Sequence, residues 1–173
     1  FSLDINDGER ICLFGDSGCG KTTLIKKLLN KCNEDMSASA IMEKGTCEVA
    51  SGLTVSYVGQ ETAGLSGSIE NYCKEHGLDK SLFCTILRQL DFDREQFLKN
   101  IENYSEGQKK KVLLATSLLT PAHLYIWDEP LNYIDVFSRL QLENLILQYQ
   151  PTMLLVEHDG VFCEKVATVT IQL

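Results

Sequence analysis

The 173-residue sequence lacks an excess of positive charge, and it lacks a long apolar run. Acidic residues outnumber Lys and Arg by 24 to 16, which gives a formal net charge of −8. A surface that mainly binds nucleic-acid phosphates needs an excess of Lys and Arg, so the composition argues against that role for the chain as a whole. The composition still allows a small basic patch. Because no run of 18 apolar residues occurs, we expect no membrane-spanning helix.

Paired cysteine motifs are lacking as well. The seven cysteines are odd in number, and no two of them form a C-x-x-C motif. We therefore expect neither a zinc site nor a secreted disulfide scaffold, and a reducing cytosol fits the composition better. No signal-peptide pattern is present and the sequence opens at Phe1 without a Met, so we expect a cytoplasmic domain excised from a longer chain.

The remaining composition, 44% hydrophobic and 23% charged, is that of a globular domain able to bury a core. Short continuous apolar runs predict strands that are buried on both faces, and helical patterns lie between them. The expected strands are 11–14, 124–127, 153–156 and 166–171, and the expected helices are 21–30, 106–120 and 135–149. This alternation predicts an α/β fold with a mostly parallel sheet flanked by helices, and ligands at the carboxyl ends of its strands.

Two stretches depart from the alternation. Residues 46–58 predict a β-hairpin with its turn at Ser51-Gly52. Residues 65–103 carry no strand signal and predict two or three short helices. Their candidate caps are Ser68, Asp79 or Ser81, and Asp93. We expect the whole chain, 1–173, to form one domain with a helical subdomain at about 64–104.

Residues 15–22 read GDSGCGKT and match the phosphate-loop pattern G-x-x-x-x-G-K-[ST], the Walker A motif. The pattern follows an expected strand and opens an expected helix, a context that disfavours the simpler interpretation as a Gly-rich turn with an exposed Lys. Backbone N–H groups of such a loop surround a phosphate, Lys21 reaches the outer phosphates, and the Thr22 hydroxyl can hold Mg²⁺. The candidate nucleotide-binding residues are Gly15, Asp16, Ser17, Gly18, Cys19, Gly20, Lys21, Thr22 and Thr23.

Asp128 and Glu129 follow the expected strand at 124–127 and precede Pro130. In a phosphate-loop protein, an aspartate at this place binds Mg²⁺, usually through water. The next carboxylate, Glu129, is a candidate general base for the attacking water. Acidic loop residues are common at strand ends, but together with the phosphate loop this pair predicts a nucleotide-hydrolysing site.

Residues 103–108 read NYSEGQ, and 19 residues lie between Gln108 and Asp128. The segment resembles the signature motif of ABC ATPases, whose common form is Leu-Ser-Gly-Gly-Gln. Ser105, Gly107 and Gln108 are retained, while Tyr and Glu replace the Leu and the first Gly. The resemblance to this superfamily covers nearly the whole chain.

The same segment also has a purely structural interpretation. Ser105 and Gln108 form a capping-box pattern at the start of a helix. Both interpretations can hold, because a capped helix N-terminus is itself an anion site. The lysines at 109–111 are expected to be mostly a solvated face, although lysines near a helix N-terminus hint that an anion docks nearby.

Other landmarks follow in the order of the ABC family. Gln60 resembles the Q-loop glutamine, residues 131–135 the D-loop, and His158 the switch histidine that touches the γ-phosphate. Taken alone, a histidine at a strand end is more often a surface residue. The resemblance implies MgATP as ligand, with residue roles as follows: catalytic Glu129, His158 and Gln60; metal-binding Thr22, Gln60 and Asp128; nucleotide-contacting Ser105, Gly107 and Gln108.

Within the superfamily, two segments resemble the ABC-F class: the run WDEPLNYID at 127–135 and the triplet Glu157-His158-Asp159. Their sequences resemble those of its antibiotic-resistance branch, the Lsa/Vga type. Members of this branch join two ATPase domains by a linker, bind the ribosome at the exit-tRNA site and help displace drugs. The resemblance therefore implies a second ABC domain as partner, and the ribosome as a partner through regions outside these residues.

The main alternative is the ATP-binding subunit of a membrane transporter, whose partner is a membrane domain. Transporter D-loops commonly carry Ser or Thr where Asn132 stands, and the 44 residues between Gln60 and Ser105 are few for a coupling groove. Chromosome-maintenance heads hold a long coiled coil in that interval, and a non-ABC kinase lacks the signature and the switch histidine. We therefore favour the ABC-F interpretation.

Overall fold

The computed structural model describes residues 3–16, 18–32 and 47–173. A parallel five-stranded sheet with the order β2-β3-β4-β1-β5 forms the centre of this part. Its strands are β1 (Arg10–Phe14), β2 (Val55–Val58), β3 (Leu124–Asp128), β4 (Met153–Val156) and β5 (Val169–Gln172). The helices are α1 (Lys21–Cys32), α2 (Ile69–Glu75), α3 (Lys80–Gln89), α4 (Glu106–Leu119), α5 (Val136–Tyr149) and α6 (Gly160–Val166). Short 3-10 turns lie at Gln96–Leu98 and Ile101–Asn103.

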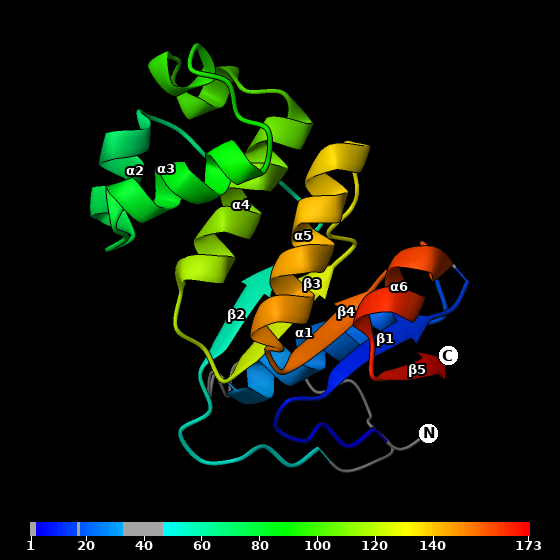
Figure 1. The fold of residues 1–173 in the computed structure, drawn as a ribbon. Coiled ribbons are helices and arrows are strands. Elements are labelled where there is room, and N and C mark those ends of the chain that lie inside the picture. The colour runs from blue at the N-terminus through cyan, green and yellow to red at the C-terminus, as the bar shows by residue number, and fades with distance from the viewer. Residues whose placement is uncertain (1–2, 17, 33–46) are drawn as a thin grey trace.

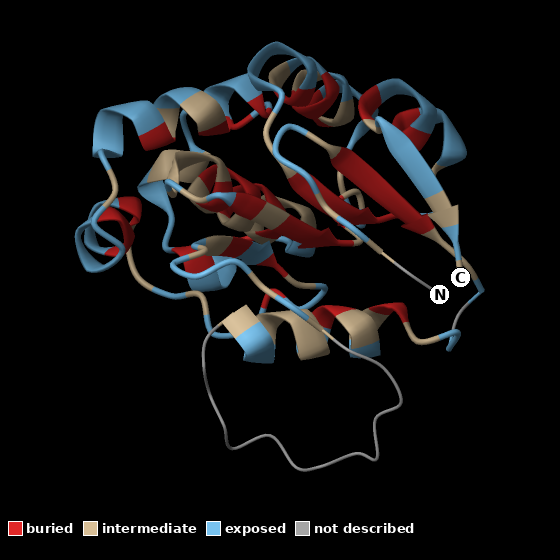
Figure 2. Cartoon of the chain, turned by 90° about the horizontal axis from the view of Figure 1, so that it is seen from below, coloured by how far each residue is buried: buried red, intermediate tan, exposed pale blue. Residues whose placement is uncertain are grey.

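Helices cover both faces of the sheet, as Figures 1 and 2 show. On one face, Ile11 and Leu13 of β1 pack with Ile25 of α1. On the other face, Cys12 packs in a cluster that includes Leu142 of α5. The alternation of successive side chains between two covered faces explains why the strands are continuously apolar. The α/β fold expected from the sequence is thus confirmed.

A third apolar cluster lies between α2, α3 and the middle of α4. It contains Ile69, Tyr72, Phe83, Leu87, Phe92, Ile101, Tyr104, Val112 and Ala115. Ser68 and Asp79 cap α2 and α3 with their side chains, as the sequence indicated. Asp93 instead precedes the 3-10 turn at Gln96–Leu98, where Gln96 N–H donates to the Asp93 carbonyl at 3.1 Å.

The expected hairpin at 46–58 forms only its turn within the described residues, and position 46 lies outside them. Leu53 N–H donates to the Ala50 carbonyl at 3.3 Å, but residues 47–50 adopt no strand. The four residues before the turn bury two side chains only partly, which is too little apolar contact to fix a strand pairing. β2 takes β3 as its parallel neighbour instead.

The C-terminal expectation also needs correction. The apolar run 166–171, taken for one strand, is split: Val166 ends α6 and the strand β5 begins only at Val169. Asp159 caps α6 by accepting a hydrogen bond from Phe162 N–H at 2.9 Å. The expected strand shares only Val166 with α6, because a continuous apolar run does not show where a short helix ends and the next strand begins.

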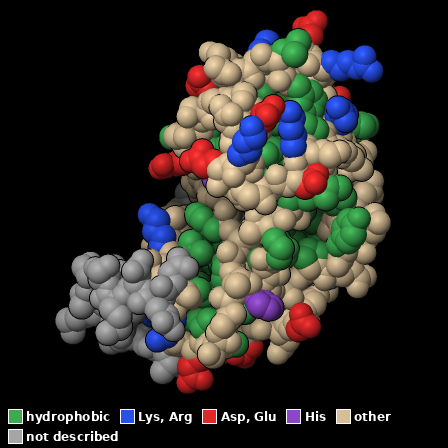
Figure 3. Space-filling model, turned by 90° about the vertical axis from the view of Figure 1, so that its left-hand side faces the viewer, with side chains coloured by type: hydrophobic (Ala, Val, Ile, Leu, Met, Phe, Trp, Pro, Cys, Tyr) green, Lys and Arg blue, Asp and Glu red, His purple; other side chains and the backbone are tan. Residues whose placement is uncertain are grey.

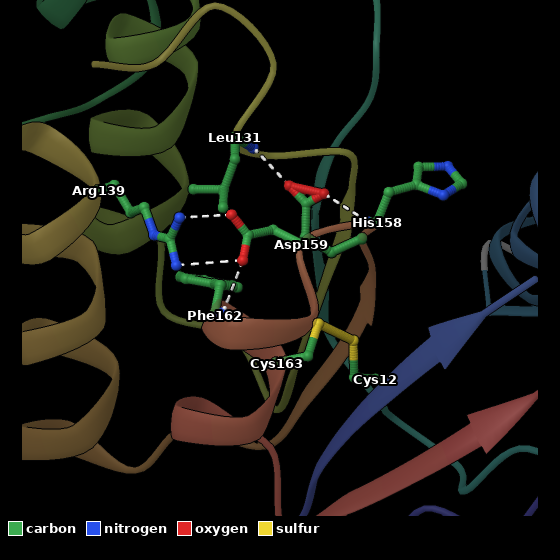
Figure 4. The surroundings of a disulfide bond; sticks show 8 residues. Cys12, Leu131, Arg139, His158, Asp159, Phe162 and Cys163 are labelled. Atoms are coloured by element: carbon green, nitrogen blue, oxygen red, sulfur yellow. Dashed lines mark hydrogen bonds and ion pairs between the residues drawn. A yellow bond between two sulfur atoms is a disulfide. The ribbon is translucent and has the colours of Figure 1, made fainter. Parts of the chain in front are cut away.

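One cysteine pair was not indicated by the cysteine motifs, although a single pair makes no disulfide scaffold. Cys12 of β1 and Cys163 of α6 are joined by a disulfide, with their Cα atoms 6.1 Å apart (Figure 4). Their separation of 151 residues hid the pair from motif analysis. The other described cysteines are free, and no cluster of three or more His, Cys, Asp or Glu in the described ranges could hold a metal. In the same ranges, no helix is long and apolar enough to cross a membrane.

Candidate functional site

The carboxyl ends of four parallel strands meet at one edge of the sheet. β1 leads into the phosphate loop, β2 into Gln60, β3 into Asp128 and Glu129, and β4 into Glu157 and His158. Parallel neighbours end on the same side, so segments far apart in sequence converge there. An open cavity of about 290 Å³ lies at this edge. Its lining residues are Gly18, Gly20, Lys21, Thr22, Thr23, Gln60, Glu129 and His158.

The phosphate loop wraps the ammonium group of Lys21. Lys21 Nζ donates to the carbonyl oxygens of Gly15 at 2.6 Å and of Asp16 at 2.9 Å, and it lies 3.6 Å from Cys19 Sγ. Gly20 adopts a φ of +106°, and nothing lies within 4 Å of the place where its Cβ would be. The loop therefore keeps its backbone clear on the side of the cavity. Ser17 lies outside the described residues, and Cys19, a predicted loop residue, is exposed.

Two other segments meet at Asp128, which is 1% exposed. Gln60 Nε2 donates to Asp128 Oδ1 at 3.1 Å, and Thr22 Oγ1 donates to Asp128 Oδ2 at 3.5 Å. Burial raises the pKa of the Asp128 carboxyl above its ordinary value, and the Gln60 hydrogen bond opposes that rise. The three residues predicted to hold Mg²⁺ are thus brought together by the fold.

Glu129 and His158 face each other across the cavity. His158 Nε2 lies 3.4 Å from Glu129 Oε1, and Asn132 Nδ2 donates to Glu129 Oε2 at 2.6 Å. Glu129 has a φ of +51°, a left-handed conformation that is uncommon for a non-glycine residue. The conformation turns the backbone directly after the Asp128 strand end, and the Glu129 side chain lines the cavity beside the loop.

The signature segment forms a separate structure at the N-terminus of α4. Ser105 and Gln108 make both bonds of a capping box: Gln108 N–H donates to Ser105 Oγ at 3.3 Å, and Ser105 N–H donates to Gln108 Oε1 at 3.0 Å. A Cβ at Gly107 would overlap the carbonyl oxygen of Tyr133, so only glycine allows the 131–135 segment to pass this close. Among the described residues, none of Ser105, Gly107 and Gln108 is in the lining of the cavity.

The segment 131–135 leads from Glu129 to α5. Asp135 caps α5 by accepting from Ser138 N–H at 2.8 Å, and Lys111 Nζ lies 2.7 Å from Asp135 Oδ2. Burial opposes ionisation of Asp135, but the bonds from Lys111 and Ser138 outweigh it and hold the pKa well below its ordinary value. The segment is therefore tied to α4 at one end and to the acidic pair at the other.

Sequence reasoning misjudged the lysines at 109–111 as a solvated face. Lys110 is fully buried and Lys111 is 7% exposed. Lys110 Nζ donates to the carbonyl oxygen of Gly59 at 2.8 Å, next to Gln60. Burial lowers the pKa of Lys110, and the negative charges of Asp128, Glu129 and Glu157 oppose that fall. The 3.6-residue period of α4 places positions 110 and 111 on the buried side of the helix, and only this periodicity could have indicated their burial.

Glu157 is a second residue whose position the sequence left unassigned. It is 4% exposed and accepts hydrogen bonds from Leu131 N–H at 3.2 Å and from His158 N–H at 2.9 Å. Burial raises the pKa of the Glu157 carboxyl. The neighbouring Asp159 faces Arg139 of α5, whose guanidinium donates to both of its carboxylate oxygens, while the His158 ring points the other way (Figure 4).

The residues at the strand ends suit a magnesium ion by their donor chemistry. A hydroxyl, an amide and a carboxylate converge at Thr22, Gln60 and Asp128, and Mg²⁺ prefers oxygen ligands of these kinds. Asp128 is buried and its charge is not matched by a direct ion pair among the described residues. A bound divalent cation would supply the missing positive charge.

Comparison with known proteins decides the family. The family model described as ABC transporter matches residues 1–132. The chain belongs to the ABC transporter family. Its ATPase activity, expected from the motifs, is the activity of this family's nucleotide-binding domains. The likeness to the ABC-F class is confirmed by the relatives that follow.

The putative ATP-binding protein YdiF of Bacillus subtilis (strain 168) is 33% identical over 176 residues, which cover 99% of this chain and 26% of YdiF. The ribosome protection protein VmlR of the same organism is 30% identical over 95% of this chain and 29% of VmlR. A solved archaeal ribosome recycling factor, aABCE1, in complex with the stalk protein aP1, superposes with a TM-score of 0.74 at 26% identity, over 97% of this chain and 32% of that one. This ABC domain thus spans about a third or less of these relatives.

Proposed function

We propose that the chain is one half of a composite MgATPase. The phosphate loop, with Gly15, Asp16, Ser17, Gly18, Cys19, Gly20, Lys21, Thr22 and Thr23, binds the phosphates of ATP. Thr22, Gln60 and Asp128 hold Mg²⁺, and the signature residues Ser105, Gly107 and Gln108 contact the nucleotide bound by a partner domain. We also propose that residues 64–104 act as the helical subdomain of this single domain.

The observation that carries the proposal is the separation between the cavity and the signature segment. The cavity is lined by residues from the strand ends, and the described signature residues are not among them. Ser105 and Glu106 are exposed, so the N-terminus of α4 points its amide end to solvent. A helix N-terminus favours an anion, and a second domain placed against it would present one.

Within the cavity, the chain's own residues have distinct tasks. Lys21 and the loop amides orient the outer phosphates. Glu129 accepts the proton of the attacking water, and His158, which reaches Glu129 at 3.4 Å, contacts the γ-phosphate and limits the positions that the water can take. Bound Mg²⁺ supplies positive charge to the phosphate oxygens. Asn132 donates a hydrogen bond to Glu129 and so links the proposed general base to the 131–135 segment.

The proposed setting is a soluble, cytoplasmic ABC-F protein that acts on the ribosome. The relatives named ribosome protection protein and ribosome recycling factor support this setting. Contacts with RNA by this domain find little support in its charge: the net charge is −8, and on the face shown in Figure 3 Lys and Arg side chains are interspersed with acidic ones. We therefore place the main ribosome contacts in other parts of the parent chain.

The deciding experiment is to measure ATP hydrolysis per mole of this chain over a wide dilution series, alone and with the twin domain of its parent. A composite site requires that the specific rate rise steeply with concentration or on adding the twin domain. A specific rate that stays high and flat in a verified monomer contradicts the composite site. Sedimentation of the full parent with ribosomes, with and without ATP, tests the setting separately.

A further inference from the structure

The segment around Gln60 is attached to the signature helix on both sides of the glutamine. Before it, the Gly59 carbonyl accepts a hydrogen bond of 2.8 Å from Lys110 Nζ. After it, Thr62 donates its hydroxyl hydrogen to the carboxylate of Glu106. Both Lys110 and Glu106 belong to α4. Gln60 is therefore held between two contacts with a helix that contributes no residue to the lining of the described cavity.

The two attachments differ in burial. Lys110 is fully buried, whereas the Glu106 side chain is 53% exposed and also pairs with Lys109. An exposed pair contributes little, while a buried ammonium group without its acceptor would be strongly unfavourable. Of these two attachments, the Lys110 bond is for that reason the one that holds Gly59 against α4; further along the strand, the buried hydroxyls of Ser56 in β2 and Ser117 in α4 also join the two elements, with their oxygens 2.7 Å apart.

Lys110 also lies near the carboxylates of the cavity. Its charge acts on Asp128, Glu129 and Glu157, three acidic residues from two strand ends. In a region where Asp128 and Glu157 are at most 4% exposed, such charges interact strongly. A buried cation behind them reduces their mutual repulsion before any metal binds.

We infer that Lys110 is a positioning residue for ATP hydrolysis, which sets Gln60 against Asp128 through the Gly59 carbonyl and links the signature helix to the domain's own metal site. The link runs from α4 through Lys110 and Gly59 to Gln60, whose amide donates to Asp128 at 3.1 Å. A displacement of α4 by a partner's nucleotide would thus be transmitted to the metal site of this domain. The inference rests on the proposed role of Gln60.

The test uses the full parent protein and the variant Lys110→Met, which keeps an unbranched apolar stem but removes the ammonium group. We expect kcat to fall roughly ten- to a hundredfold because a misplaced Gln60 disturbs the reacting geometry. The Mg²⁺ concentration that gives half the maximal rate should rise, and the KM for ATP should change little. Lys99→Met, at an exposed site outside α4, is the control for loss of a lysine charge and should leave all three values unchanged.

A double-variant cycle separates positioning from a general structural effect. Because Lys110 acts through Gln60, Gln60→Ala with Lys110→Met should be no slower than Gln60→Ala alone. Losses that multiply, or a Lys110→Met protein with the parent kcat, overturn the inference. If Gln60→Ala itself keeps full activity, the proposed role of Gln60 fails, and the inference fails with it. Should Lys110→Met not fold, Lys110→Gln retains a donor for Gly59 and should keep a kcat near that of the parent. A folded Lys110→Gln whose kcat falls ten- to a hundredfold would overturn positioning through the Gly59 carbonyl.

Discussion

Two polar ends of the domain, the cavity at the carboxyl ends of the strands and the N-terminus of α4, differ in solvent exposure. At the strand ends, Lys21 is 6% and Asp128 1% exposed, and burial raises the pKa of Asp128. At the start of α4, Ser105 and Glu106 are exposed. There the hydrogen bond from Thr62, followed by that from Lys109, lowers the pKa of Glu106. The first end is arranged within one chain, whereas in the proposed composite site the second would gain its effect only when a partner covers it.

The difference predicts which substitutions act in the isolated chain and which require a pair. Desolvated, hydrogen-bonded groups are already in place and affect nucleotide binding directly. Exposed donors around a capped helix contribute little until another surface excludes water from them. The predictions below use this contrast, beginning with the largest expected effect.

Glu129→Gln in the full parent protein should lower kcat by about 10²–10⁴, because the amide cannot accept the proton of the attacking water. ATP binding should survive, so the variant should accumulate in its ATP-bound state. Steady-state hydrolysis and retention of labelled ATP measure the two effects. Glu61→Gln, at an exposed site one residue past Gln60, is the control. A parent-like rate in Glu129→Gln would assign the base elsewhere, with His158 as the next candidate.

Ser105→Arg should lower the hydrolysis rate of the paired protein by about 10²–10³, the range for loss of a transition-state donor. ATP binding by the isolated chain should be unaffected, since Ser105 is not in the lining of its cavity. Rate against concentration and titration calorimetry test the two halves of the statement. Ser81→Arg, exposed in α3, controls for added charge. Weaker ATP binding by the isolated Ser105→Arg chain would break the contrast between the two ends.

Lys21→Ala should weaken ATP binding to the isolated chain roughly tenfold or more, because it removes one charge-assisted contact in a partly shielded site. Titration calorimetry with ATP measures the change. Lys26→Ala, on the exposed side of α1, should bind like the parent. Equal affinity of Lys21→Ala and the parent chain would refute the assignment of the phosphate loop.

The smallest expected effect concerns pH. Burial raises the pKa of Glu157, so the folded chain keeps this proton at pH values where the unfolded chain has lost it. The free energy of unfolding contributed by this group therefore falls as pH rises from the ordinary Glu pKa through the raised one. Glu157→Gln should flatten that part of the curve. Melting temperatures over an acidic to neutral pH series measure it, and superimposable profiles would argue against the shift.

The sequence predicted the elements whose signals are local. The strands around 11–14, 124–127 and 153–156 and the caps at Ser68, Asp79 and Ser105 were found from short patterns. Thr22 and Asp128 were assigned from the phosphate-loop motif and the acidic pair, and Gln60 from the resemblance to ABC ATPases; the structure brings the three together.

The parts that escaped depend on tertiary packing. Whether Lys110 faces water is decided by the strand against which α4 packs, and a run of three lysines reads as exposed. The pairing of Cys12 with Cys163 depends on contact across 151 residues. The boundary between α6 and β5 was missed, because the apolar run 166–171 includes the last residue of the helix as well as the start of the strand.

Helix α4 belongs to two apolar cores at once. Leu114 packs into the cluster against the sheet, while Val112 and Ala115 pack into the cluster with α2 and α3. Interiors packed to this density do not deform smoothly, so α4 cannot turn about its own axis without disturbing both. Helices α2, α3 and α4 should consequently move as one rigid body relative to the sheet. A displacement of α2 or α3 would therefore tilt the whole of α4, including its N-terminus, and would not rotate α4 about its axis.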